Sequence, residues 1–246
     1  KDLFEFFQNN LTQQEITKYT ILKNLPIYEQ VNGQLVSLKD LNWNIVKDFP
    51  EEFINFSNTF NILKDNQSYF LSNLGVTELP KHELYLRILK IEKEKLSHSC
   101  IIRILKDSDI DKSLFEELKK SSIIPDSKGK LKKASEFLNP ENFSFIDMLG
   151  KDSEFFPHEN FRNDEILMIL SKLGMHSDLT ENHILEIAQI ISKQANGIEL
   201  SKKCAMILIQ HIDKLSINES FLEKLLKIRW FPCAKIDQVQ ELGYQA

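Results

Sequence analysis

Residues 123–132 read IIPDSKGKLK, and this stretch predicts a small β-hairpin. Pro125 keeps the residue before it out of the helical region, so the first arm is extended. The turn ends in Gly129, which tolerates the positive φ that tight turns need, and the residues KLK return as the second arm. Residues 27–36 read IYEQVNGQLV and predict a similar hairpin around Asn32-Gly33.

Outward from these hairpins, landmark residues recur in the same order about one hundred positions apart. Each copy has an apolar residue before a proline, then a Gly-x-Leu turn, a Leu-Gly step and a histidine. We therefore predict tandem units: the end of one unit at 1–24, repeat unit one at 25–123, repeat unit two at 124–230, and the start of a further unit at 231–246. The landmarks are Pro26, Gly33, Gly75 and His82 in the first, Pro125, Gly129, Gly174 and His183 in the second, and Pro232 in the last.

Amphipathic helices are predicted after each hairpin. Asn163 can cap the start of a helix, and Gly174 can end the same helix by adopting a left-handed backbone conformation. Thr180 begins a helix whose apolar residues follow the i, i+3, i+4, i+7 pattern. Further apolar stripes predict helices at 204–215 and 221–226, and repeat unit one has counterparts near 84–96, 101–105 and 114–118. The expected fold is α+β and predominantly helical, each unit being a small β-hairpin followed by four or five amphipathic helices.

The composition is that of a globular protein, since 42% of the 246 residues are hydrophobic and 27% are charged. Acidic residues outnumber basic ones by 36 to 31, which gives a net charge of −5. The chain therefore has no global positive field to attract nucleic acid or anionic lipid. No apolar run approaches the roughly 20 residues that span a bilayer. We expect neither nucleic acid nor a membrane as a partner.

The chain begins at Lys1 rather than Met, so we interpret it as a segment of a longer protein. Its cysteines, Cys100, Cys204 and Cys233, lie far apart in the sequence. This distribution favours free thiols in a reducing compartment.

The motifs of common catalytic and phosphate-binding sites do not occur in the sequence, and glycine is too sparse for a phosphate cradle. The pairs His98 with Cys100 and Cys204 with His211 lack the tight paired spacing of metal ligands. We therefore expect no catalytic residue, no cofactor and no metal.

Asp107, Asp109 and Asp111 begin like a calcium-binding loop. However, Lys112 stands where that loop needs glycine, and Leu118 stands where it needs a bidentate glutamate. We interpret these acids as part of a solvated helix cap.

Three further groups of residues receive structural interpretations. His82 and His183 are expected to cap a helix or bridge backbone groups. A basic cluster around the second hairpin is interpreted as a solvated edge that lysines protect from pairing, and a phenylalanine run with helical spacing as core. The lysines are Lys119, Lys120, Lys128, Lys130, Lys132 and Lys133, and the phenylalanines are Phe49, Phe53, Phe56 and Phe60.

Two other hypotheses stay open. The chain could be an enzyme or ligand-binding domain whose site is assembled from scattered residues such as His82, His183 and the acids Asp107, Asp109 and Asp111. It could also be a self-associating module in which units stack between chains.

The repeat resembles the repeat regions of the sacsin family. The likeness rests on four segments of repeat unit one and four of repeat unit two. They are 25–28 (LPIY), 32–36 (NGQLV), 69–71 (YFL) and 74–76 (LGV), then 124–125 (IP), 129–131 (GKL), 134–140 (ASEFLNP) and 155–157 (FFP).

The resemblance implies a giant cytoplasmic protein linked to chaperone function, with protein clients or co-chaperones as partners. Repeats of that family contain an ATP-binding fold that needs an Asp-x-Gly-x-Gly loop, and this loop does not occur here. The expected role is therefore a non-catalytic scaffold and protein-binding segment in proteostasis or cytoskeletal maintenance, and the segment by itself is expected to be monomeric.

Overall fold

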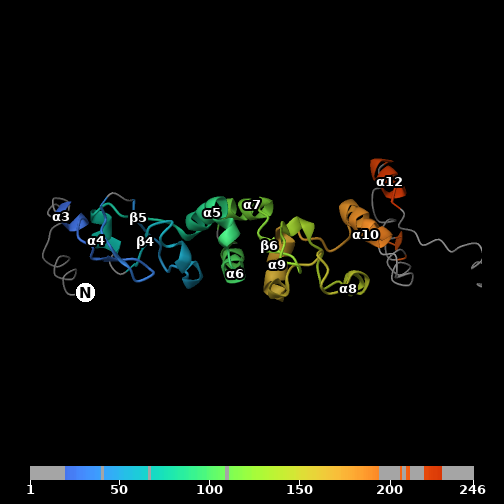
Figure 1. Cartoon of the computed structure of the whole chain (residues 1–246), viewed down its shortest axis with the longest axis horizontal. Helices are drawn as coiled ribbons and strands as arrows, with labels where there is room; N and C mark the ends of the chain where they lie inside the picture. Colours follow the sequence, from blue (N-terminus) through green and yellow to red (C-terminus); the bar gives the residue numbers. More distant parts are fainter. Residues whose placement is uncertain are drawn as a thin grey trace, which may run out of the picture. The chain divides into compact units, whose positions relative to one another are not determined.

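The computed structural model describes residues 20–39, 42–65, 68–108, 111–193, 206, 209–210 and 219–228. The chain forms two compact units, Lys1–Ser121 and Ser122–Ala246, called unit 1 and unit 2 below. The predicted repeat boundaries at 24, 123 and 230 stay predictions. The α+β class with mostly helical structure and small sheets is confirmed (Figure 1).

Unit 1 combines two small sheets with helices. β1 and β2 form the predicted antiparallel hairpin, and β4, β3 and β5 form a parallel sheet in that order, which the sequence did not predict. Its elements, with η for 3-10 helices, are α3 (Thr20–Lys23), β1 (Tyr28–Glu29), β2 (Leu35–Val36), β3 (Asn44–Ile45), η1 (Glu51–Phe56), β4 (Ile62–Leu63), α4 (Ser68–Asn73), β5 (Thr77–Glu78), α5 (Lys81–Ile91), η2 (Lys93–Lys95), α6 (His98–Asp107) and α7 (Lys112–Lys120).

Unit 2 begins with the second predicted hairpin, in which β6 and β7 are antiparallel. Asn163 caps α9, because its side-chain oxygen accepts the N–H of Ile166 at 3.0 Å, as the sequence predicted. The elements of unit 2 are β6 (Ile124–Pro125), β7 (Leu131–Lys132), η4 (Ala134–Glu136), α8 (Phe143–Leu149), η5 (Glu159–Phe161), α9 (Asp164–Lys172), α10 (Glu181–Lys193) and α12 (Glu219–Leu226).

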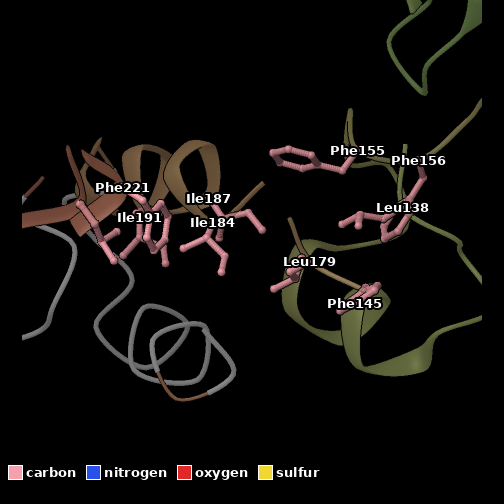
Figure 2. Packing of buried hydrophobic residues seen from close by; sticks show 11 residues of the cluster. Leu138, Phe145, Phe155, Phe156, Leu179, Ile184, Ile187, Ile191 and Phe221 are labelled. Carbon is pink, nitrogen blue, oxygen red and sulfur yellow. The ribbon is translucent and has the colours of Figure 1, made fainter. Parts of the chain in front are cut away.

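A hydrophobic cluster of unit 2 joins α8 and the segments between η4 and α10 to α10 and α12. The predicted stripe of α10 is buried, and α12 contributes two further buried residues. Figure 2 shows this cluster, which contains Leu138, Phe145, Phe155, Phe156, Leu179, Ile184, Ile187, Ala188, Ile191, Phe221 and Leu225. Because short helices are unstable singly in water, these contacts hold α10 and α12 in place.

The two hairpins share one hydrogen-bonding pattern. In each, the turn glycine donates its N–H at 2.9 Å to the carbonyl of the residue that follows the first strand. Gly33 has a φ of 86° and Gly129 a φ of 84°. Glu29 at the end of β1 therefore takes the place of Pro125 at the end of β6. The predicted match between Pro26 and Pro125 is wrong, because Pro26 precedes β1 altogether.

Glycine ends α4 and α9 in the same way. Gly75 has a φ of 87° and Gly174 a φ of 111°. In both helices the residue after the glycine donates its N–H to a carbonyl of the last turn, at 3.1 Å after α4 and 2.9 Å after α9. This is the Schellman arrangement, which requires a left-handed residue and so favours glycine.

The segment after each of these caps makes a similar parallel pairing. In unit 1 the N–H of Thr77 donates to the carbonyl of Trp43 at 3.1 Å. In unit 2 the N–H of His176 donates to the carbonyl of Phe137 at 3.0 Å, and Leu138 forms a parallel bridge with His176. In both units, therefore, a glycine-capped helix and then a parallel pairing precede a longer helix, which is α5 in unit 1 and α10 in unit 2.

The buried faces of α5 and α10 correct a second predicted match. Thr77 and His176 are equivalent by their backbone pairing, so positions in α5 and α10 can be numbered from them. With this numbering, the four buried residues of α5 fall at the same positions as four of the buried residues of α10. His183 then corresponds to Leu84, a core residue, and His82 lies on a different face of its helix. The predicted equivalence of His82 and His183 is therefore wrong, although both histidines lie near the start of a helix.

Candidate functional site

The candidate site is a cavity of about 610 Å³ in unit 2. Side chains from β7, from η4 and from one face of α10 line it, together with the segment that precedes α10. The lining residues on which its chemistry depends are Lys132, Glu136, Glu154, His176, Thr180 and His183.

His183 caps the helix on which it lies. Its Nδ1 atom accepts the backbone N–H of Thr180 at 3.3 Å and lies 3.0 Å from the Thr180 hydroxyl, while the N–H of His183 donates to that hydroxyl at 3.3 Å. This reciprocal pair has the pattern of a capping box, with histidine in the place of glutamate or glutamine. The predicted capping role of His183 is confirmed.

The surroundings of His183 keep its ring neutral. Burial, and after it the charges of His176 and Lys132, lower the pKa of His183 from 6.5 to about 4, although the backbone carbonyl of Glu136 acts in the opposite direction. The His176 and His183 rings meet edge to face, with centroids 5.4 Å apart. A proton on Nδ1 would also remove the acceptor that caps α10.

Lys132 and Asp126 form a buried ion pair beside the cavity. The Lys132 Nζ lies 3.4 Å from Asp126 Oδ2 and donates to the carbonyl of Glu154 at 2.7 Å. Asp126 is fully buried, and its Oδ1 accepts the backbone N–H groups of Lys128 and Lys130 at 2.8 and 2.9 Å. One carboxylate thus shapes the hairpin turn and holds the ammonium group.

The burial of Lys132 corrects the interpretation of the basic cluster as a solvated edge. Lys128, Lys130 and Lys133 are exposed as expected, but Lys132 exposes only 8% of its surface. A sequence signal existed, because Val36 of β2 is the apolar counterpart of Lys132 in the first hairpin.

The acids and the histidine singled out in unit 1 make separate structural contacts. The His82 Nε2 lies 3.8 Å from Asp111 Oδ2, while Asp111 caps α7 by accepting the N–H of Leu114 at 2.9 Å. Hydrogen bonds from Ser113 and Leu114, and the nearby His82, lower the pKa of Asp111. The predicted helix cap is therefore confirmed at Asp111.

Asp107 serves a different contact, and Asp109 lies outside the described residues. Asp107 accepts the Tyr85 hydroxyl at 2.7 Å and the Arg103 Nε at 3.0 Å. Burial, and then this carboxylate, raise the pKa of the Tyr85 hydroxyl. Among the residues that the structure describes, no group of three or more His, Cys, Asp or Glu side chains is arranged to hold a metal ion.

Other candidates belong to the core or lie outside the described part of the chain. Cys100 is a buried free thiol that donates to the carbonyl of Glu52 at 3.0 Å. Phe53, Phe56 and Phe60 are buried as predicted, whereas Phe49 is half-buried. Pro232, Cys204, His211 and Cys233 lie outside the described residues.

The chain is similar to human sacsin. The two are 26% identical over 257 residues, which cover 88% of this chain and 6% of sacsin. No family model matches the chain, and no solved structure matches it. The likeness to sacsin is distant but extends along nearly the whole chain. In the described part of the chain, no helix combines the length and apolar character needed to cross a bilayer.

Proposed function

We propose that this chain is a segment of a large cytoplasmic, sacsin-like chaperone or co-chaperone, in which it acts as a non-catalytic scaffold that binds proteins. The observation that carries the proposal is the similarity to human sacsin, which extends over 88% of this chain and only 6% of sacsin. A segment that is matched so completely within so small a part of a large relative fits a building block better than a self-contained enzyme.

The proposal includes a tandem architecture of units about one hundred residues long. Its support is the shared order of local structures: a hairpin with a positive-φ glycine, a glycine-capped helix, a parallel pairing and then a longer helix. The last described helix of each unit also packs on the corresponding longer helix, since α7 packs on α5 in unit 1 and α12 packs on α10 in unit 2. Repetition of this kind suits a spacer that presents similar surfaces at intervals.

A light-scattering assay tests the protein-binding role. The purified 246-residue chain is added to a heat-denatured client protein, and an equal mass of serum albumin serves as the control. We expect the chain to reduce aggregation of the client in proportion to its concentration. Aggregation equal to that in the albumin control would contradict the proposal.

Two further measurements test the proposals that the chain is not catalytic and that it is a monomer. Incubation with ATP is expected to release no more phosphate than a heat-inactivated control. Sedimentation over a hundredfold range of concentration is expected to give the 28.7 kDa mass of one chain throughout. Turnover above the control would support an enzyme, and a mass that rises with concentration would support the self-associating module.

A further inference from the structure

Unit 1 has a hollow beside its hairpin, with a volume of about 340 Å³. Its lining comes from the turn between β1 and β2, the segment after β3, the helix η1 and the segment after β4. This lining has an apolar part and a charged part, which together indicate what the hollow can bind.

The apolar part of the lining is only partly covered by the fold. Val46 is buried, Val31 and Phe49 are half-buried, and Ile54 is 42% exposed. On η1 the neighbouring Phe53 is fully buried in the core, whereas Ile54 stays at the surface of the hollow. These side chains therefore offer apolar contact to a group that enters the hollow.

The charged part of the lining is mainly acidic. It consists of Asp48, Glu51, Lys64 and Asp65. The Lys64 Nζ is already paired with Glu29 at 3.0 Å, and Asp48, whose side chain is 93% exposed, lies 4.0 Å from the Nζ of Lys81. With these partners included, four carboxylates stand against two ammonium groups.

Glu51 and Asp65 carry the unpaired charge. Both are exposed, and neither forms an ion pair with any residue that the structure describes. An apolar surface with an excess of carboxylates at its edge is complementary to a side chain that has an apolar stem and a cationic end.

The same corner can be located in unit 2 from the bridges that follow the first strand of each hairpin. Gln30, directly after β1, forms an antiparallel bridge with Leu63. Asp126, directly after β6, forms an antiparallel bridge with Pro157. Residues that lie equally far beyond these bridges are therefore counterparts in the two units.

In unit 2 an arginine of the chain itself occupies this corner. The Nη2 of Arg162 donates to the hydroxyl of Ser127 at 2.7 Å, and its Nε donates to the carbonyl of Pro157 at 2.7 Å. Ser127 is the counterpart of Val31 in the lining of the hollow. The guanidinium carbon also lies 5.8 Å from the centre of the Phe156 ring.

Carboxylates accompany this arginine as well. Burial lowers the pKa of Arg162, whereas the negative charges of Asp152 and Glu159 raise it. Glu159 is the counterpart of Asp65, because each lies two residues beyond the bridged residue. The corner of unit 2 thus holds a guanidinium group close to an acid that unit 1 also has.

Unit 1 does not fill its corner in this way with any residue that the structure describes. The described arginines of unit 1 are Arg87 and Arg103. Each is paired on its own helix, with Glu83 at 2.6 Å and with Asp107 at 3.0 Å, and neither lines the hollow.

We propose that the hollow of unit 1 binds an arginine side chain of a client protein. The stem of the arginine lies on Val31, Phe49 and Ile54, and its guanidinium group faces the carboxylates of Glu51 and Asp65. Arginine suits these carboxylates because its planar group can donate to two oxygens at once. This inference rests on the proposed protein-binding function and names the kind of client segment that the chain takes.

A titration followed by NMR tests the site. The ¹⁵N-labelled 246-residue chain is titrated with the tripeptide Ala-Arg-Ala, blocked at both ends, and with the same peptide containing citrulline, whose side chain is neutral, in place of arginine. We expect saturable shifts of the amides of Val31, Ile54 and Asp65 with the arginine peptide and at least about fivefold weaker binding of the citrulline peptide. Equal binding of the two peptides would overturn the proposal.

Matched variants separate the hollow from the general negative charge of the chain. Glu51→Gln combined with Asp65→Asn is expected to weaken binding of the arginine peptide about tenfold, because both unpaired carboxylates are lost. Glu52→Gln removes a neighbouring exposed acid that does not line the hollow, and it should change binding less than about twofold. Ile54→Ser is expected to weaken binding about threefold, since apolar contact with the stem is lost.

Equal weakening by Glu52→Gln and by the double variant would overturn the site, and so would unchanged binding in the double variant. Circular dichroism of each variant checks the fold, and Asp65→Asn alone provides the comparison if the double variant does not fold. A chain that suppresses aggregation but does not bind the arginine peptide would lose this site and keep the proposed function. A chain that binds the peptide without suppressing aggregation would keep the site and lose that function.

Discussion

The Nδ1 atom of His183 lies 3.0 Å from the hydroxyl oxygen of Thr180 and also accepts the Thr180 N–H at 3.3 Å. Glutamate or glutamine usually occupies this position in a capping box. Histidine differs from both because it can acquire a proton at the atom that accepts the hydrogen bond. The start of α10 therefore depends on the neutral form of the ring.

The first prediction concerns the pH dependence of stability. The pKa of His183 is about 4 in the folded chain and 6.5 in the unfolded chain. The unfolded chain therefore takes up this proton first, so the free energy of unfolding should fall as the pH falls from about 6.5 to about 4 and change no further from this group below that. Each unit of the shift corresponds to about 1.4 kcal/mol, which gives a loss of a few kcal/mol at most.

Urea unfolding of the wild type and of His183→Gln at pH 7.5 and pH 5 measures this effect. Glutamine keeps an oxygen for the cap and does not titrate, so the variant should lose less stability between the two pH values. An equal loss in both proteins would exclude His183 as the source.

The second prediction concerns the buried ion pair. Lys132→Met should destabilise the chain by about 3 kcal/mol, because the fully buried carboxylate of Asp126 loses its partner charge. Adding Asp126→Asn should recover part of that loss, so the double variant should be more stable than the sum of the single changes implies. Urea unfolding of both single variants and the double variant measures this coupling.

Lys133→Met is the matched control for the ion pair. Lys133 follows Lys132 in the sequence but is exposed, so its replacement should change stability by less than about 0.5 kcal/mol. Additive effects of the Lys132 and Asp126 changes would contradict the assigned ion pair.

The third prediction concerns the two capping glycines. Gly75→Val and Gly174→Val should each destabilise by more than about 1 kcal/mol, because φ values of 87° and 111° are costly for a β-branched residue. A Cβ atom at Gly174 would lie 3.5 Å from Ser135 Cβ, an ordinary contact, so strain of the backbone rather than a clash causes the loss. Gly174→Ala should cost less than valine in denaturant melts, and unchanged stability in Gly174→Val would remove the assigned cap.

The fourth prediction concerns the N-cap of α9. Asn163→Ala should cost about 1 kcal/mol, since the N–H of Ile166 loses the acceptor at 3.0 Å. Asn163→Asp should retain most of the stability, because aspartate accepts the same hydrogen bond. Thermal unfolding of the two variants decides this, and an equally large loss in both would show that the cap oxygen contributes nothing.

Several parts of the fold could be predicted because the decisive residues are close in sequence. The hairpin around Gly129 needs only a proline, a turn and a positive φ within ten residues, and the structure has the strands there. The caps at Asn163 and Gly174 are equally local. The buried stripe of α10 follows from helical periodicity alone.

The candidate site could not be predicted in the same way. The sequence predicts the capping role of His183, but it pairs this residue with His82 in the other repeat unit, because spacing alone does not show which face of a helix is buried. The sequence does not predict a role for His176, since a histidine after a helix cap has no distinctive pattern. The sequence predicts a solvated Lys132 because lysine is seldom buried without a partner, and the pattern does not show that Asp126 is that partner.

By itself, the sequence determined the local structure of this protein: two glycine hairpins, capped helices with apolar stripes, and no long apolar segment. Tertiary structure alone decided the parallel pairing of β3 with β4 and β5, the burial of Lys132 on Asp126, and the cavity beside His183. The physical reason is the separation in sequence of the residues that interact. Turns and caps are stabilised by hydrogen bonds between near neighbours, whereas pairing, burial and hollows depend on segments that meet only after the chain has folded.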